Sequence, residues 1–199
     1  MPWPSRSRSR SRAAALVAIL ALASLGASDA ETLIAGTFDP PRVAPELGLA
    51  GSDGQVLALG RFRGKVVALA FGFTSCPEVC PTTLAVLAQA RKKLGERAGE
   101  LQVVYVTVDP DRDDAARMKQ YLAGFDSSFV GGTGSETQLA AVRREYGIQA
   151  EKHPSAAGAT FSHSSFIYLI DRGGKLRALM PYGHSPDDFA HDVGILLAE

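Results

Sequence analysis

The feature that most constrains the fold is an almost wholly apolar run over residues 66–73, which leads into a cysteine-bearing turn. A run without polar alternation is typical of a strand buried on both faces, as in parallel sheets covered by helices. Pro81 follows, and proline suits the first turn of a helix because the amide has no partner there. Apolar residues then recur at helical spacing as far as Leu94. The sequence therefore predicts a buried strand, a turn that carries two thiols, and a helix.

The other segments predict a mixed sheet around this unit. Further strands are expected at residues 47–50, 55–59, 101–108, 165–170 and 175–180, with hairpin turns at Asp53-Gly54 and Gly173-Gly174. Further helices are expected after a cap at Asp111 or Asp113, from a capping box at Ser135 and Gln138 to Gly147, and from Pro186 to Leu197. Residues 31–46 and 150–161 are expected to be loops. This order predicts an α/β, thioredoxin-like fold, a mixed sheet flanked by helices with an N-terminal hairpin extension.

Residues 1–30 predict a secretory signal peptide. Arginine alternates with serine over residues 5–12, an apolar run covers residues 13–25, and Ser28 and Ala30 supply the small residues before a cut after Ala30. The alternative is an uncleaved membrane anchor, but the apolar run is shorter than the about 20 residues that span a bilayer. We therefore expect residues 31–199 to form one domain in the periplasm or at the outer face of the inner membrane.

The composition narrows the possible functions. The 21 Lys and Arg residues of the 199-residue chain balance its 21 Asp and Glu residues, so no global field recruits nucleic acid. Two cysteines are too few for a small domain held together by several disulfides. The position of these cysteines therefore matters more than their number.

Cys76 and Cys80 lie between the predicted strand and helix. Amides at a helix N-terminus favour negative charge, so we expect the thiolate form to be stabilised there. A dithiol oxidoreductase has two residues between its thiols, whereas this chain has three. A peroxidatic motif is absent, because Phe73 and Leu69 stand where Thr or Ser and Pro are needed. The longer spacing thus weakens the oxidoreductase interpretation without removing it. The other interpretations are a soft metal site with two thiolates and one imidazole, and a purely structural pair of cysteines.

His163 is the candidate third ligand. It stands just before the strand predicted at residues 165–170, which packs beside the first buried strand in a thioredoxin-like sheet. Topology alone leaves His163 equally a ligand or an ordinary hydrogen-bonded side chain. His153, His184 and His191 are interpreted as solvated or hydrogen-bonded histidines without a ligand role.

Four segments together resemble the Sco/SenC family. They are GKVVALAFGFTSCPEVCPTTL, VTVDPDRD at residues 106–113, FSHSSFIYLIDRGGKL and the PYGHSPDD tail, and the resemblance extends over nearly all of residues 35–198. It implies a thioredoxin-like copper-binding protein that acts in assembly of the binuclear copper site of cytochrome c oxidase. Cys76, Cys80 and His163 match the family's copper-ligand positions, and Asp109 matches an acidic residue that supports the site from nearby.

Three positions depart from the family pattern. Ser75 stands where histidine is common, Phe73 where tyrosine is common, and Ser162 replaces the aspartate that usually precedes the ligand histidine. None of these changes removes a ligand. The third raises the question of what holds the His163 ring, because a ligating histidine usually donates its other N–H to an acceptor.

We therefore predict an exported copper chaperone that binds Cu(I) or Cu(II). It is expected to deliver copper to the copper-bearing subunit of cytochrome c oxidase, or to reduce the cysteines of that site. Its expected partners are that subunit and other copper carriers, close to a membrane and without nucleic acid. The alternative is an enzyme, an extracytoplasmic thiol–disulfide reductase in which Cys76 and Cys80 are the redox pair and His163 tunes their reactivity. The longer cysteine spacing and His163 favour copper.

Overall fold

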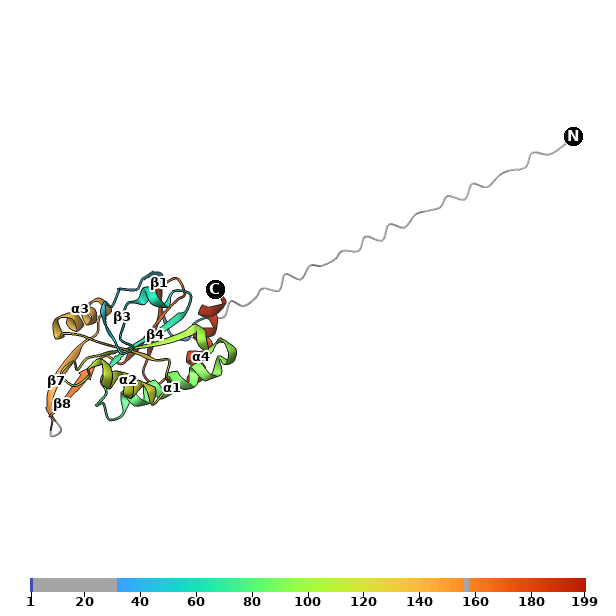
Figure 1. The fold of residues 1–199 in the computed structure, drawn as a ribbon. Helices are drawn as coiled ribbons and strands as arrows, with labels where there is room; N and C mark the ends of the chain where they lie inside the picture. The colour runs from blue at the N-terminus through green and yellow to red at the C-terminus, as the bar shows by residue number, and fades with distance from the viewer. Residues whose placement is uncertain (2–31, 156–157) are drawn as a thin grey trace. The chain divides into compact units, whose positions relative to one another are not determined.

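The predicted buried strands lie at the centre of one sheet (Figure 1). The computed structural model describes residue 1, residues 32–155 and residues 158–199, so the signal peptide predicted for residues 1–30 lies almost wholly outside the described residues and stays a prediction. The strands are β1 (Gly36–Val43), β2 (Leu49–Gly51), β3 (Val56–Leu57), β4 (Val66–Gly72), β5 (Leu101–Thr107), β6 (Val130–Thr133), β7 (Ala150–Ser155), β8 (Gly158–His163), β9 (Phe166–Ile170) and β10 (Lys175–Pro181). The helices are α1 (Val79–Lys93), α2 (Ala115–Ala123), α3 (Glu136–Tyr146) and α4 (Pro186–Ala198), with short 3-10 helices η1 (Leu59–Phe62) and η2 (Gly95–Glu100).

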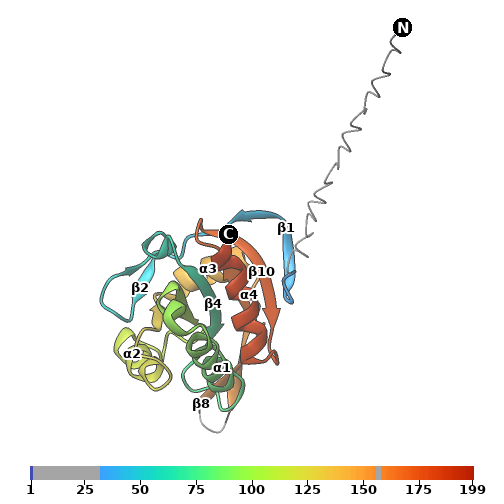
Figure 2. The same cartoon turned by 90° about the vertical axis from the view of Figure 1, so that its right-hand side faces the viewer.

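The sheet is mixed and covered by helices on both faces. Within the described residues, eight strands follow the order β1-β10-β9-β4-β5-β6-β2-β3, and β7 pairs with β8 in a separate hairpin. β4, β5 and β6 run parallel, whereas β9 is antiparallel to β4. α1 and α4 pack side by side on one face, and α3 covers the other (Figures 1 and 2). This arrangement confirms the predicted fold class, and β2–β3 is the predicted N-terminal hairpin.

Successive side chains of the central strands point to opposite faces of the sheet, and this decides which residues each helix packs against. β4 and β5 are buried along their whole length, as their apolar sequences predict. Phe71 packs against Tyr146 of α3, with ring centroids 5.6 Å apart. A Cβ at its neighbour Gly72 would point to the opposite face, toward Tyr105 of β5 and Cys80 of α1. The last residues of β4 therefore bring α1 close to the sheet.

Two segments predicted to be loops are strands instead. β1 pairs with β10 at one edge of the sheet, and Pro40 and Pro41 fall within the register shift between Thr37 and Arg42. Proline is tolerated at such an edge because it removes no central ladder bond. Residues 150–161 belong largely to the antiparallel β7–β8 hairpin. Strand β6 lies at residues 130–133, for which no strand is predicted.

The cap of α2 differs from the expected one. Asp114, rather than Asp111 or Asp113, is the N-cap residue, and its carboxylate accepts a hydrogen bond from the Arg117 amide at 2.7 Å. Asp113 is fully buried and bonds elsewhere. The capping box predicted for α3 is confirmed, as is the left-handed Gly147 that ends this helix.

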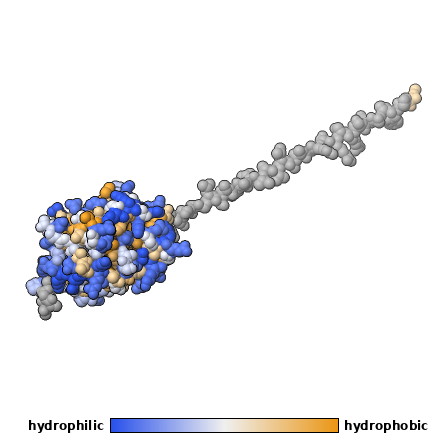
Figure 3. All heavy atoms as spheres, viewed as in Figure 1, coloured by the Kyte–Doolittle hydropathy of each residue, from blue (hydrophilic) through white to orange (hydrophobic). Residues whose placement is uncertain are grey.

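The surface is mainly polar. Figure 3 shows a hydrophilic face on which apolar side chains are scattered. Among residues 32–155 and 158–199, no helix is long and apolar enough to cross a membrane. Among the large apolar side chains that remain exposed, Phe166 also lines a small cavity together with Cys80 and His163.

Candidate metal centre

Cys76 and Cys80 lie where β4 gives way to α1, as predicted. Cys80 is the second residue of α1 and is buried, whereas Cys76 lies in the preceding turn and is half-buried. The amide of Cys80 donates to the Cys76 sulfur over 3.4 Å. The first turn of α1 therefore presents an amide to one thiol and directs the other toward the sheet. Both thiols are free.

Gly72 allows Cys80 to approach the sheet so closely. A Cβ atom at residue 72 would lie 2.1 Å from the Tyr105 hydroxyl oxygen and 2.7 Å from the Cys80 sulfur. Both distances are shorter than real Cβ contacts, so a side chain here would displace one of the two groups. The Tyr105 hydroxyl contacts the Cys80 thiol and donates to the Phe73 carbonyl at 3.5 Å. A glycine at the end of β4 is thus part of the site.

The expected stabilisation of thiolate is wrong for Cys80. Burial raises the pKa of this thiol to about 12, and the neighbouring Cys76 thiol raises it further. The contact with the Tyr105 hydroxyl and a hydrogen bond at the Phe73 backbone lower the pKa, but burial outweighs them. The Cys80 thiol therefore keeps its proton at neutral pH, and a metal ion that binds it must displace that proton.

His163 is the last residue of β8, and its ring faces Cys80. Its Nε2 atom lies 3.8 Å from the Cys80 sulfur, and its Nδ1 atom lies 3.0 Å from the Ser164 carbonyl oxygen. A carbonyl cannot donate, so Nδ1 carries a proton and Nε2 is the ring nitrogen that faces Cys80 and is available to a metal ion. The Ser164 backbone therefore performs the task that an acidic residue at position 162 would otherwise perform.

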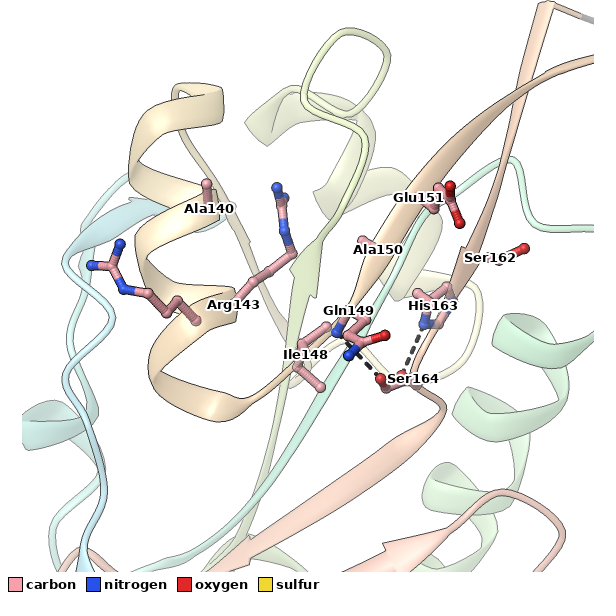
Figure 4. A pocket seen from close by; sticks show the side chains of 10 residues that line it. Ala140, Arg143, Ile148, Gln149, Ala150, Glu151, Ser162, His163 and Ser164 are labelled. Atoms are coloured by element: carbon pink, nitrogen blue, oxygen red, sulfur yellow. Dashed lines mark hydrogen bonds between the residues drawn. The ribbon is translucent and has the colours of Figure 1, made fainter.

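His163 separates two cavities. On one side it lines a space of about 10 Å³ with Cys80 and Tyr105. On the other side it borders a wide cavity of about 680 Å³ between α3 and the β7–β8 hairpin, whose walls include Gln149 and Ser164 (Figure 4). One histidine thus stands between a buried thiol and open solvent.

The β7–β8 hairpin fixes the position of His163. Phe161, two residues earlier in β8, packs against Phe73 with ring centroids 5.4 Å apart, and the His163 ring meets the same phenyl ring edge-on at 6.1 Å. Phe73 directly follows β4. The same aromatic side chain thus contacts the hairpin that carries the imidazole and begins the turn that carries the thiols.

The structure brings the three predicted ligands together without completing a three-ligand site. In the part of the chain that the structure describes, no three His, Cys, Asp or Glu side chains are placed to hold one metal ion. Cys80 and His163 face each other, whereas the sulfur of Cys76 accepts the Cys80 amide. Closure around a metal ion therefore requires the Cys76 sulfur to come closer to the Cys80–His163 pair.

The other three histidines have hydrogen-bonding partners away from the thiols. His153 contacts the Ser162 hydroxyl at 3.1 Å, and His184 contacts the Asp188 carboxylate at 3.2 Å. His191 lies 3.0 Å from the carboxylate of its neighbour Asp192.

Asp109 is buried at the end of β5, and its carboxylate pairs with Arg112. The Arg112 guanidinium lies 6.0 Å from the centroid of the Phe73 ring. Asp109 is therefore connected to the cysteine turn through Arg112 and Phe73. Its supporting role stays a prediction.

Asp113 is a residue of the site region that the sequence reasoning assigned to a helix cap. Its carboxylate accepts hydrogen bonds from the Thr74 amide at 2.9 Å, the Thr74 hydroxyl at 2.5 Å and the Thr107 hydroxyl at 2.7 Å. The sequence feature that indicates this role is the position of Asp113 after a buried strand, because the carboxyl ends of parallel strands meet at one edge of the sheet.

The fold and this site define a class: a thioredoxin-like domain with two thiols at a strand-to-helix turn and an imidazole facing them. The SCO1/SenC family model matches residues 36–198. The chain belongs to this family.

Individual relatives agree with this assignment. A SCO2-like protein of Rickettsia conorii is 32% identical over 140 residues, which cover 69% of this chain and 68% of the relative. The copper-bound structure of Bradyrhizobium japonicum ScoI is 31% identical, with a TM-score of 0.70, and the match covers 76% of this chain and 98% of ScoI. Copper-bound Arabidopsis thaliana ScoI matches with a TM-score of 0.73 and 28% identity, over 79% and 99% of the two chains.

Proposed function

We propose that this protein binds copper through Cys76, Cys80 and His163 and passes it on during assembly of cytochrome c oxidase. The observation that carries the proposal is the 3.8 Å approach of the His163 Nε2 atom to the Cys80 sulfur, with Cys76 on the same turn. Copper-bound structures of two Sco relatives and the family's connection with oxidase assembly support it.

The donor set suits copper. Two thiolates and one imidazole are soft to intermediate ligands, which favour Cu(I) over hard cations. Two thiolates alone can hold Cu(I), whereas Cu(II) favours nitrogen, so His163 matters more for the oxidised ion. The half-buried Cys76 and the open cavity beside His163 leave the copper accessible to an incoming ligand. Few ligands near the surface favour transfer rather than permanent storage.

A second candidate function is thiol–disulfide reduction, and one observation favours it. Cys76 is half-buried and can be reached from solvent, whereas Cys80 is buried behind it. An accessible thiol that attacks a partner disulfide, followed by a protected thiol that resolves the mixed disulfide, needs this order. Reduction of the acceptor's cysteines would prepare them for copper, so both activities serve the same assembly step.

The proposed setting is outside the cytoplasm. The basic segment, the apolar run and the small residues before position 31 support export to the periplasm or to the outer face of the inner membrane. The copper-bearing subunit of the oxidase is the proposed acceptor, and other copper carriers are the proposed donors. Intact-mass analysis of the protein from its native compartment tests the cut after Ala30.

The deciding experiment compares copper binding with disulfide reduction in matched variants. Residues 31–199 should retain about one copper per chain, and Cys76→Ala or Cys80→Ala should abolish this retention. His163→Ala should weaken Cu(II) strongly and Cu(I) less, while the cysteines still form a disulfide. His184→Ala is the control, because that ring is held by Asp188 and should change neither quantity. Unchanged Cu(II) affinity with a collapsed rate of peptide-disulfide reduction would replace the chaperone with the reductase.

A further inference from the structure

The turn that carries Cys76 is tied to the sheet edge by one buried carboxylate. Asp113 is fully buried, and three donors converge on its two oxygens, two of them from Thr74. The third donor is the hydroxyl of Thr107, the last residue of β5, which also accepts the Asp109 amide at 2.9 Å. Thr74 lies two residues before Cys76. The carboxylate therefore joins the end of β5 to the cysteine turn.

The backbone of Asp113 is fixed independently of its side chain. Its carbonyl accepts a hydrogen bond from the hydroxyl of Thr133, the last residue of β6, at 2.6 Å, and its amide donates to the Asp109 carbonyl at 3.0 Å. Parallel strands β4, β5 and β6 thus all end around this one residue. A side chain anchored in this way can hold a neighbouring turn without moving with it.

Arg117 closes the network from the solvent side. Its Nε atom donates to the Thr74 hydroxyl at 2.7 Å and lies 3.5 Å from the Asp113 carboxylate, while another nitrogen reaches the Ser75 hydroxyl at 3.2 Å. The Thr74 hydroxyl therefore donates to the carboxylate and accepts from the guanidinium. Ser75, directly before Cys76, is held by the same arginine. Arg117 of α2 therefore restrains both Thr74 and Ser75, the two residues that precede the half-buried Cys76.

We infer that Asp113, acting through Thr74 and assisted by Arg117, is a positioning residue that holds the cysteine turn in the geometry needed to capture copper. The Cys76 sulfur must join Cys80 and His163 to complete a three-ligand site, and an anchored turn limits how far this sulfur can move. Release of the anchor should make Cys76 more accessible and its capture of copper less effective. The copper arm of this inference rests on the proposed function, whereas the thiol arm does not.

The experiment measures three quantities on Asp113→Asn and Thr74→Val in the protein that contains residues 31–199. They are the rate of Cys76 alkylation by iodoacetamide, the affinity for Cu(I) in competition with a chelator, and the melting temperature. Loss of a group that orients ligands typically costs 10–100-fold in metal affinity, so we expect a loss of about tenfold for Asp113→Asn. Alkylation of Cys76 should accelerate severalfold. Thr74→Val should change both quantities in the same direction, and Thr74→Ser should restore wild-type values because it keeps the hydroxyl.

Asp192→Asn is the matched structural control. Asp192 is also fully buried, and its carboxylate accepts two backbone amides, those of Ile34 and Ala35, at 2.8 and 2.9 Å. Its substitution should lower the melting temperature without changing alkylation or copper affinity.

The inference is overturned if Thr74→Val keeps wild-type alkylation and affinity, or if Asp192→Asn changes them as much as Asp113→Asn does. If Asp113→Asn does not fold, Thr74→Val against Thr74→Ser decides. If the wild type binds no copper, the proposed function fails, and the alkylation rates alone decide whether the turn is anchored.

Discussion

Two buried aspartates anchor two different parts of this chain, and the comparison separates stability from function. Asp113 bonds to the turn that carries the cysteines, and Asp192 in α4 bonds to the backbone of Ile34 and Ala35, just before β1. Both are fully buried, and each accepts at least one backbone amide. A buried carboxylate is costly unless donors satisfy it, so both must contribute to folding. The two differ in the segment that each carboxylate holds: loss of Asp113 would release the cysteine turn, and loss of Asp192 would release the backbone before β1.

The largest effect that tests this comparison is expected at two glycines, one beside the cysteine turn and one beside Asp192 in α4. Gly72→Ala would place a Cβ within 2.7 Å of the Cys80 sulfur, whereas Gly194, two residues after Asp192 in α4, has nothing near its missing Cβ. We expect Gly72→Ala to cost about 3 kcal/mol of unfolding free energy through overpacking and to abolish copper retention. Gly194→Ala should instead gain about 0.5–1 kcal/mol from helix propensity.

Urea unfolding and copper content of the two alanine variants provide the measurement. If Gly72→Ala is as stable as Gly194→Ala, α1 can move away from the sheet without cost in unfolding free energy. Full copper retention in Gly72→Ala would show that the close approach of Cys80 to the sheet is not needed for binding.

The second largest effect is expected at Asp192 itself. Asp192→Ala leaves the amides of Ile34 and Ala35 without their acceptor, which should cost about 2 kcal/mol. Release of this segment should also create an early protease cleavage site between residue 32 and β1. Limited proteolysis with mass analysis, together with urea unfolding, measures both effects. The cysteines should keep wild-type alkylation rates, and faster alkylation would contradict the division between the two regions.

The same two regions show what the sequence could predict. The strand, the cysteine turn and α1 were predictable because the apolar run, Pro81 and the helical spacing all agree locally. The cap of α3 follows from side chains three residues apart, and the start of α4 follows from Pro186. Such signals act within one element, and the structure confirms them.

What could not be predicted depends on partners distant in the chain. β1 contains two prolines and is a strand only because β10 accepts it at the sheet edge. The His163 hairpin has few apolar residues, and it is held by Phe73 from another element. Asp113 reaches Thr74, 39 residues earlier, and Asp192 reaches Ala35, 157 residues earlier. A buried aspartate that serves a distant backbone looks, in sequence, like an ordinary helix cap or helix residue.

The smallest effect is expected at an exposed ion pair that joins the His163 hairpin to the turn after β5. The Lys152 ammonium lies 2.7 Å from the Asp111 carboxylate, and this contact lowers the pKa of Asp111 and raises the pKa of Lys152. Because the pKa of Asp111 is lower in the folded state, its contribution is present above the unfolded pKa and is lost as pH falls through the folded pKa. Solvent and salt screen such a pair, unlike the buried anchors.

Asp111→Asn should therefore leave the melting temperature at neutral pH and the copper content nearly unchanged. Thermal unfolding at low and high salt, at neutral and acidic pH, measures this, and a loss as large as that of Asp192→Ala would show that burial does not distinguish the anchors from this pair.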